Sequence, residues 1–454
     1  MVYNSKKGER GNLCMSELTI NKHFSNIPDE FPTSGQDWAN HIAGFYNSDT
    51  LIKVVLELEG HLDLYLMKKA IRISIDAVPV LGCSFEERDS EPVWKRFINI
   101  DAMEWCLFEE SQNQQASLEN FLISSFLPNN RQFQTKLIRT DSNDILCLVF
   151  NHACSDAAGI KDYLNILSEI YNNLIENKDY YPVSNAFENM DTQKIFKNLG
   201  ISNLSQAWNP KQEASAPTWA FPYNKEKKQS LKVAVHKLNQ KEFKSLYLYA
   251  KERDATINDL IMTAFYRALF VLIKTNDLEP MEITTTADLR RYLPTKKAQS
   301  ICNLSGKINM KLMKINNETF DGTLNRISLM MKNLKKNNPG INNAIAMELL
   351  RGMGYKNVSL FLENSSKKAI ANEKSSPLFS NMGIIAKYPL KMGNTLVKDA
   401  YIVSPAGYPP NFIFAFGSYN DILTMTVSYY EPTTSTEDIT HFFNLLTNEL
   451  SSRL

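Results

Sequence analysis

Apolar and polar residues alternate in the first clear structural segment of the chain, residues 51–58. Ile52, Val54, Leu56 and Leu58 fall on one side of an extended chain, whereas Lys53 and Glu57 fall on the other. This period of two predicts a β-strand with one buried face. After Gly60 the apolar residues change to helical spacing until Pro79, which ends the predicted helix. The segment VPVLGCSF then predicts a second strand.

A strand followed by a helix recurs later in the chain. Leu231, Val233 and Val235 alternate with other residues, and Asn239 with Glu242 forms a capping-box pattern at the start of a helix. The segment ATINDLIMTAFYRALFVLI is too apolar for a surface helix, so we expect it to pack deep inside this second half.

The end of the chain predicts a hairpin and a final helix. NFIFAFG and the alternating residues Leu423 to Tyr429 flank the turn-like SYND, which favours antiparallel pairing. Ser435 and Asp438 are suitable caps for a last helix whose apolar side faces inward.

A loop-like region separates the two similar halves. Residues 179–228 contain YYPVSN and WNPKQEASAPTWAFP and have few periodic apolar positions. A chain of 454 residues is long enough for two or three domains. We therefore predict an N-terminal domain over 16–178, a linker over 179–228 and a C-terminal domain over 229–454. We predict that both domains are mixed α/β, an α+β sandwich of sheets flanked by helices.

Composition and charge narrow the function classes. The chain is 43% hydrophobic and 22% charged, as in a globular soluble protein, and its net charge of +1 gives no field for nucleic acid or an anionic membrane. Six scattered cysteines without a C-x-x-C pair argue against a zinc framework and a secreted disulfide scaffold. No apolar run is long enough for a membrane span, and the N-terminus has no signal core, so we expect a cytoplasmic protein.

The candidate chemistry lies where a buried strand changes into a helix. ILCLVF, beginning at Ile145, is apolar throughout and is followed by Asn151-His152-Ala-Cys-Ser-Asp156, then by Gly159 and an amphipathic helix. A strand-to-helix turn holds a side chain rigidly at a sheet edge, where a histidine can act as a general base. Asp156 can bond backbone N–H groups at the helix start or pair with an arginine. A histidine and an aspartate at this spacing also arise by chance. Their position between a buried strand and an amphipathic helix is what indicates a functional histidine.

These segments resemble the acyltransferase superfamily of nonribosomal-peptide condensation domains, chloramphenicol acetyltransferase, wax-ester synthases and alcohol O-acetyltransferases. The family motif H-H-x-x-x-D-G is similar to Asn151 through Ala157, with Asn151 in place of the first histidine and Ala157 in place of glycine. LELEGHLDLYLMKKAIRISIDAVPVLGCSF, ATINDLIMTAF, DLRRYLP and LFSNMG look like other segments of the superfamily, so the resemblance runs over most of the chain.

The resemblance implies two chloramphenicol-acetyltransferase-like domains that meet at an active-site tunnel. His152 would deprotonate a hydroxyl or amine acceptor as it attacks an acyl thioester. The co-substrate would be acyl-coenzyme A or a phosphopantetheine thioester, with no bound cofactor. Asp156 would pair with an arginine and fix the loop, and Arg290 of DLRR is the candidate partner. Gly159 permits close approach of the backbone.

Other residues have weaker assignments. Ser380 or Asn381 of SNMG could donate to the oxyanion, and Asn151 could contact substrate, although a Ser-Asn-x-Gly segment is also ordinary turn chemistry. Cys154 is expected to be a packed cysteine, because one histidine, one cysteine and one aspartate leave a zinc site short of ligands. We expect no metal.

Two alternatives to a coenzyme A-dependent transferase stay open. One is a stand-alone condensation-type enzyme that forms an amide or ester and uses a carrier protein in trans. The other is a non-catalytic relative that keeps the fold as a binding platform, which Asn151 and Ala157 keep in consideration.

Overall fold

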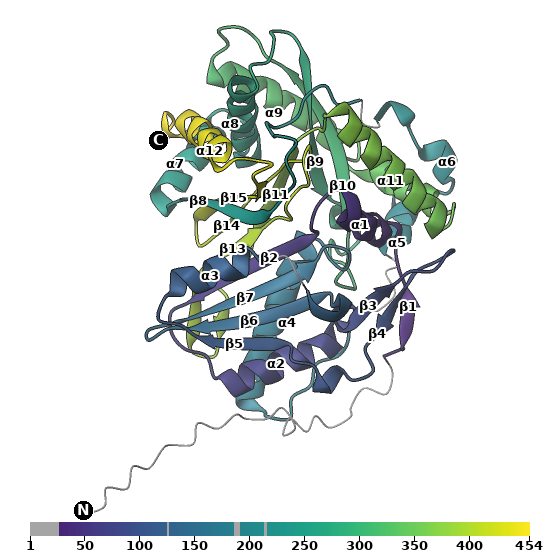
Figure 1. The fold of residues 1–454 in the computed structure, drawn as a ribbon, viewed down its shortest axis with the longest axis vertical. Helices are drawn as coiled ribbons and strands as arrows, with labels where there is room; N and C mark the ends of the chain where they lie inside the picture. Colours follow the sequence, from purple (N-terminus) through teal and green to yellow (C-terminus); the bar gives the residue numbers. More distant parts are fainter. Residues whose placement is uncertain (1–26, 125–126, 186–190, 213–215) are drawn as a thin grey trace, which may run out of the picture.

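Each half of the protein is built on a six-stranded β-sheet (Figure 1). The computed structural model describes residues 27–124, 127–185, 191–212 and 216–454. Cys14 and His23 lie outside these residues, as do the first part of the predicted domain over 16–178 and parts of the predicted linker.

The first sheet has two buried strands at its centre. Its order is β12 (Lys391–Met392), β13 (Thr395–Val403), β2 (Leu51–Leu58), β7 (Asp144–Asn151), β6 (Phe133–Arg139) and β5 (Cys106–Glu110). All neighbouring strands are antiparallel except β5 and β6, which are parallel. One face packs against α2 (Leu64–Ala77) and α4 (Ala157–Glu176), and α3 (Gln114–Leu122) packs against the other.

Two predictions about this half are wrong in part. β2 has the predicted bounds, but both of its faces are buried, because α3 covers the side that carries Lys53. The Lys53 ammonium donates to the carbonyl oxygen of Leu122 at the end of α3. In VPVLGCSF only the end is a strand: Pro79–Gly82 form a 3-10 helix, since proline lacks the N–H that strand pairing needs. The end of the segment forms strand β3 (Cys83–Glu86). This strand belongs to a small separate sheet with the order β1 (Glu30–Pro32), β4 (Val93–Arg96), β3.

The second sheet confirms the pattern predicted for the C-terminal half. Its order is β10 (Ser305–Met313), β9 (Pro280–Asp288), β11 (Leu378–Ile384), β14 (Ile413–Tyr419), β15 (Ile422–Glu431) and β8 (Ser230–Leu238). β14 and β15 form the predicted hairpin, and Asn420 and Asp421 in its turn both have positive φ. The predicted caps of Asn239 and Ser435 are present.

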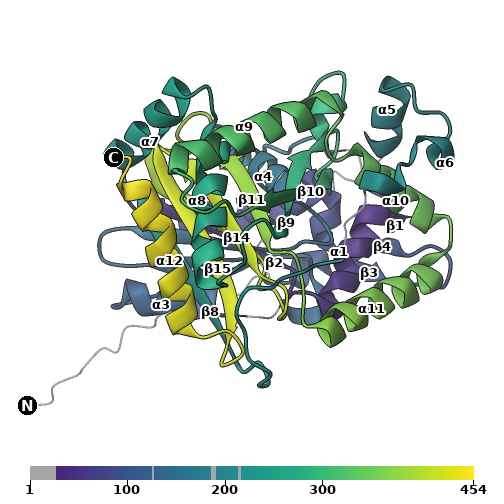
Figure 2. The same ribbon diagram turned by 90° about the horizontal axis from the view of Figure 1, so that it is seen from above.

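Four helices cover the outer face of this sheet (Figure 2). They are α7 (Gln240–Glu252), α8 (Ile257–Leu272), α9 (Phe320–Lys336) and α12 (Thr436–Ser451). α8 is the predicted core helix, and most of its residues are buried. A further group of helices packs beside β10: α1 (Gly35–Tyr46), α10 (Ile341–Arg351) and α11 (Tyr355–Asn372).

Strand pairing crosses the predicted domain boundary. β12 and β13 belong by sequence to the 229–454 domain, yet they extend the sheet of the first half, with Ala400 opposite Leu56. The predicted linker also contains helices, α5 (Asp191–Asn198) and α6 (Leu204–Ala207), and Ile195 and Phe196 of α5 are buried. A short helix of this kind escapes periodicity analysis because it offers too few apolar positions.

Within the described residues, no single helix is long and apolar enough to cross a membrane. α7 and α8 reach that length and composition only together, as a pair bent by 98°.

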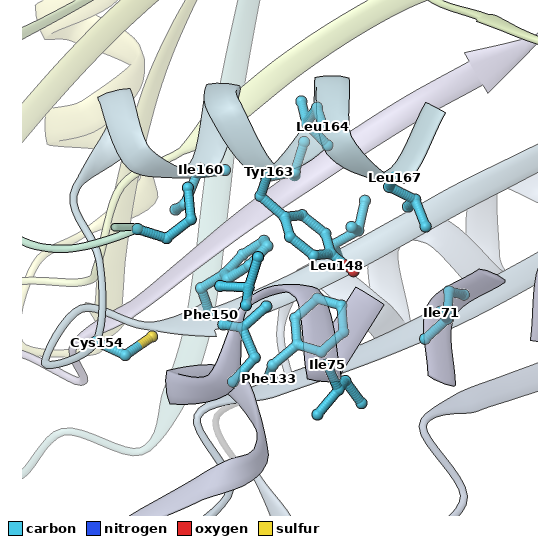
Figure 3. Close-up of a cluster of buried hydrophobic side chains, with 14 of the residues drawn as sticks. Ile71, Ile75, Phe133, Leu148, Phe150, Cys154, Ile160, Tyr163, Leu164 and Leu167 are labelled. Atoms are coloured by element: carbon cyan, nitrogen blue, oxygen red, sulfur yellow. The ribbon is translucent and has the colours of Figure 1, made fainter. Parts of the chain in front are cut away.

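The core beneath α4 contains three aromatic rings in mutual contact (Figure 3). Phe133 of β6 lies 4.9 Å from Phe150 of β7 and 5.1 Å from Tyr163 of α4, measured between ring centroids. The Tyr163 hydroxyl bonds to Ser74 of α2 at 2.8 Å. These contacts fix α4 on the sheet and therefore fix the turn that precedes it.

Replacing Phe133 by alanine should lower the free energy of unfolding by about 3–5 kcal/mol, because it leaves a cavity among these rings. Phe45→Ala removes a ring that is 58% exposed and should change the free energy of unfolding by less than about 0.5 kcal/mol. The shift of the urea midpoint measures both. Equal effects of the two substitutions would contradict the assigned core.

Candidate active site

The loop after β7 is fixed by its own backbone and by β2. The backbone N–H of His152 donates to the carbonyl of Thr50 at 2.7 Å, and Cys154 N–H donates to the carbonyl of Asn151 at 3.0 Å. The Asn151 side chain accepts from Ala153 N–H at 2.9 Å. The asparagine that replaces the first motif histidine therefore helps to shape the loop.

Asp156 ends this loop and begins α4. Its Oδ1 accepts from the Gly159 N–H at 2.9 Å, as an N-cap residue does. Its Oδ2 accepts from Arg290 Nη1 at 2.9 Å and from the Leu304 N–H at 2.8 Å. The carboxylate thus joins the start of α4 to two segments of the second half.

The predicted ion pair between Asp156 and Arg290 is present, and both side chains are almost completely buried. Burial alone would raise the pKa of Asp156, but the charge of Arg290 and the hydrogen bonds outweigh it and hold the pKa below its usual value. Arg290 also donates to the Cys302 carbonyl at 3.0 Å. Its backbone lies in a 3-10 helix, Leu289–Tyr292, which directly follows β9.

Gly159 permits a close approach of two segments. A Cβ atom there would collide with the Ser155 hydroxyl and would lie 3.3 Å from the Cys302 carbonyl oxygen. Glycine at this position therefore lets the first turn of α4 lie against residues 301–302.

Asn303 holds His152 in one orientation. Its Nδ2 faces three acceptors: the carbonyls of His152 at 2.9 Å and Ala153 at 2.8 Å, and Asp37 Oδ1 at 3.2 Å. This set of acceptors fixes the amide orientation, so Asn303 Oδ1 faces His152 Nδ1 at 3.2 Å. Oδ1 accepts the proton on Nδ1, and the neutral imidazole keeps its lone pair on Nε2.

The environment keeps His152 uncharged at neutral pH. Burial lowers its pKa below 6.5, and this effect exceeds the opposing effects of a hydrogen bond to its own backbone, the charge of Asp156 and the bond to Asn303. A neutral imidazole with a lone pair on Nε2 is able to accept a proton.

Asn303 and Asp37 are site residues that the sequence analysis did not identify. Asp37 forms a capping box with Ser34 at the start of α1, a pattern that the segment TSGQD displays. It also accepts from Trp94 Nε1, and burial raises its pKa to about 6. For Asn303 no local signal exists, because its partners come from distant parts of the chain.

The other predicted site residues have different surroundings. Asn381 bonds to Asn258 at 3.0 Å and to the Gly383 N–H at 2.8 Å, so its amide serves a local turn. Ser380 is half-buried on β11. Neither forms a hydrogen bond with His152 in the described part of the chain. Cys154 is buried, and its thiol bonds to the Asn151 carbonyl at 3.1 Å.

A small pocket with a volume of about 20 Å³ lies behind the loop. Asp37, Cys154 and Cys302 contribute to its lining, together with Trp94 and Ser300. The described residues contain no cluster of three or more histidine, cysteine and acidic side chains arranged to hold a metal.

The family profile of the condensation domain matches residues 36–288, which is more than half of the chain. The chain belongs to the condensation-domain family. The match spans the loop of His152 and extends to Asp288, two residues before Arg290. A comparison with curated protein sequences gave no match.

Solved structures show the same fold at low sequence identity. The first condensation domain of the calcium-dependent antibiotic synthetase is 12% identical, with a TM-score of 0.70 over 93% of this chain and 96% of that one. The trichothecene 15-O-acetyltransferase TRI3 from Fusarium sporotrichioides is 12% identical, with a TM-score of 0.68 over 93% and 95%. Polyketide synthase associated protein 5 from Mycobacterium tuberculosis, also 12% identical, has a TM-score of 0.64 over 93% and 100%. The two-lobed architecture of this condensation-domain protein is therefore the predicted one.

Asp156→Ala should lower the free energy of unfolding by about 3–5 kcal/mol, because it leaves the buried Arg290 charge without its partner. Asp288→Ala is the matched control: this carboxylate also lies near Arg290, at 3.2 Å, but is 53% exposed, so its loss should cost less than about 1 kcal/mol. Urea unfolding measures both. Because the folded pKa of Asp156 lies below 3.8, its advantage over the variant should be full above that pH and fall as the pH drops further. Full stability with lost turnover would contradict the loop-fixing role.

Asn303→Leu should lower the pKa of His152 further, because the hydrogen bond from the imidazolium to Oδ1 is lost. Asp37→Asn disturbs the same region but keeps that bond, and should leave the pKa nearly unchanged. Titration of ¹³C-labelled histidine by NMR measures the pKa without any substrate. An unchanged pKa in Asn303→Leu would show that Asn303 does not position the imidazole.

Proposed function

We propose that this protein transfers an acyl group from a thioester to a hydroxyl or amine, with His152 as the general base. The observation that carries the proposal is the contact between His152 Nδ1 and Asn303 Oδ1, because it leaves the lone pair on Nε2. Membership of the condensation-domain family, and the fold shared with the acetyltransferase TRI3, support the same chemistry.

The reaction needs one proton to move twice. The acceptor gives its proton to Nε2 as its oxygen or nitrogen attacks the thioester carbonyl, which forms a tetrahedral oxyanion. Collapse of this intermediate breaks the carbon–sulfur bond, and the departing thiolate takes the proton from the imidazolium. No covalent enzyme intermediate and no bound cofactor are required, since the two substrates react directly.

Asp156 and Arg290 fix the loop and take no part in the proton transfer by His152. Both oxygens of the carboxylate are occupied by Gly159, Leu304 and Arg290, so the carboxylate does not serve as a relay for His152. Asn381 is a poor donor to the oxyanion, because its amide already bonds to Asn258 and Gly383.

The donor is either acyl-coenzyme A or an acyl group on a carrier protein. Membership of the condensation-domain family favours a carrier-bound donor. A condensation domain of the calcium-dependent antibiotic synthetase also shares the fold. The acetyltransferase TRI3 shares it as well. The five cysteines that the structure describes are buried free thiols, in keeping with a place in the reducing cytoplasm.

A non-catalytic binding role is the alternative from a different class. Asn151 and Ala157 depart from the family motif, but Asn151 supports the loop through Ala153 N–H. These departures therefore leave the imidazole in place, and we rank the catalytic role first.

His152→Ala should reduce thiol release by about 100-fold or more, because the general base is lost. The assay mixes a panel of acyl-coenzyme A donors with pooled alcohols and amines, and then repeats the mixture with acyl groups loaded on a carrier protein. Cys154→Ala, in the same loop, is the control for local packing and should retain activity. Equal rates in wild type and His152→Ala would remove His152 from the reaction. No release from either donor class, with tight binding of a partner, would favour the platform role.

A further inference from the structure

On β9 and β10, the inner face of the second sheet is polar and the outer face is apolar. Along β10, Met310 and Leu312 belong to the core beneath the helices, whereas Ser305, Lys307 and Asn309 fall on the other face. On β9, Ile283 similarly faces the core, and Thr284 and Thr286 face the other way.

Strand register places these side chains in a row across the sheet. Lys307 lies opposite Thr286, Ser380 opposite Ala415, and Ala415 opposite Thr426. β11 joins β9 with Phe379 beside Thr285, so the next residues, Ser380 and Thr286, are neighbours. Apart from Lys307, every side chain in the row is small. Lys307 is exposed and Thr286 and Ser380 are partly exposed, whereas Ala415 and Thr426 are buried.

This face points toward the first half of the protein. Ala415 and Tyr419, on the same side of β14, belong to the core of the first half, and the covering helices lie on the opposite side (Figure 2). β10 begins two residues after Asn303, which contacts His152. With about 3.3 Å per residue along an extended chain, the Cα atoms of Lys307 and Asn303 are at most about 13 Å apart.

Lys307 carries a charge without a partner. No described acidic side chain forms an ion pair with it, whereas Lys311, on the same face of the same strand, lies 3.7 Å from Glu282. Solvent reaches the Lys307 side chain, yet the surrounding protein lowers the pKa of its ammonium through desolvation alone. The ammonium is therefore accessible to a solute although protein groups lie close to it.

Hydroxyl groups without partners line the same row. Thr426 is completely buried, and its hydroxyl has no hydrogen-bond partner among the described residues. The hydroxyls of Thr286 and Ser380 likewise form no hydrogen bond within the described part of the chain. A polar group that accepts hydrogen bonds from the partly exposed hydroxyls of this row would be stabilised by them.

We propose that Lys307, assisted by the Thr286 and Ser380 hydroxyls, binds an anionic group, a carboxylate or a phosphate, of one of the two substrates. This inference rests on the proposed function only in its reference to substrates. An anion at this place supplies the missing counter-charge and accepts hydrogen bonds from the hydroxyls. A flexible substrate that binds there can extend to the imidazole of His152, because the separation is at most about 13 Å between the two backbone segments.

The first test measures anion binding without turnover. Reductive methylation with ¹³C-formaldehyde keeps the lysine charge and gives each lysine an NMR signal, and the Lys307 signal is the one that disappears in Lys307→Arg. Sodium acetate and inorganic phosphate should shift this signal with saturation, whereas acetamide and equal ionic strength of sodium chloride should not. The Lys311 signal, assigned through Lys311→Arg, is the matched control and should not saturate. A Lys307 response equal to that in sodium chloride would overturn the proposal, whether or not the enzyme transfers acyl groups.

The second test identifies which substrate carries the anion. Acceptors are compared in pairs that differ only by a carboxylate and its amide, and donors are compared as acyl-coenzyme A and the acyl-N-acetylcysteamine thioester, which lacks phosphate. Lys307→Met should reduce kcat/KM by about 10- to 100-fold for the charged member of one pair and leave its neutral member nearly unchanged. Loss in the acceptor pair assigns the anion to the acceptor, and loss in the donor pair assigns it to the phosphates of the donor. Equal loss for charged and neutral members, or no loss beyond that of Lys311→Met, would overturn the proposal.

Discussion

The carboxylate of Asp156 is the point on which the geometry of the site depends. It caps α4 through the Gly159 N–H and binds Arg290 and the Leu304 N–H of the second half with its other oxygen. A buried carboxylate needs all of these partners, because low polarity makes an unpaired charge very unfavourable. The requirement therefore ties the start of a helix in one half to a loop in the other.

Strand pairing makes a second connection between the two halves. β13 leaves the second half and pairs with β2, so the sheet of the first half is completed by a distant part of the chain. Tyr419 strengthens the connection, because its hydroxyl donates to the Val397 carbonyl at 3.1 Å. With both connections present, the two halves position His152 and Asn303 jointly, which neither could do alone.

The charges around the site fall into three kinds. The pair of Asp156 and Arg290 is buried and neutral overall, and it supports the loop. His152 is uncharged because burial lowers its pKa. Among the described residues of the row, Lys307 carries a charge that no acidic side chain compensates, and under our proposal it distinguishes anionic substrates from neutral ones. Support of the loop, proton transfer and substrate recognition are then functions of separate groups.

The sequence by itself determined the local elements and the centre of the site. β2, β7, α4 and α8 follow from the spacing of apolar residues, since that spacing sets which side chains share a face. The turn that presents His152 follows from β7 and α4. Only the tertiary structure decided the contact of Asn303 with His152, the crossing of β13 and the row that contains Lys307. These depend on strand register between segments far apart in the chain, and no local pattern encodes register across such distances.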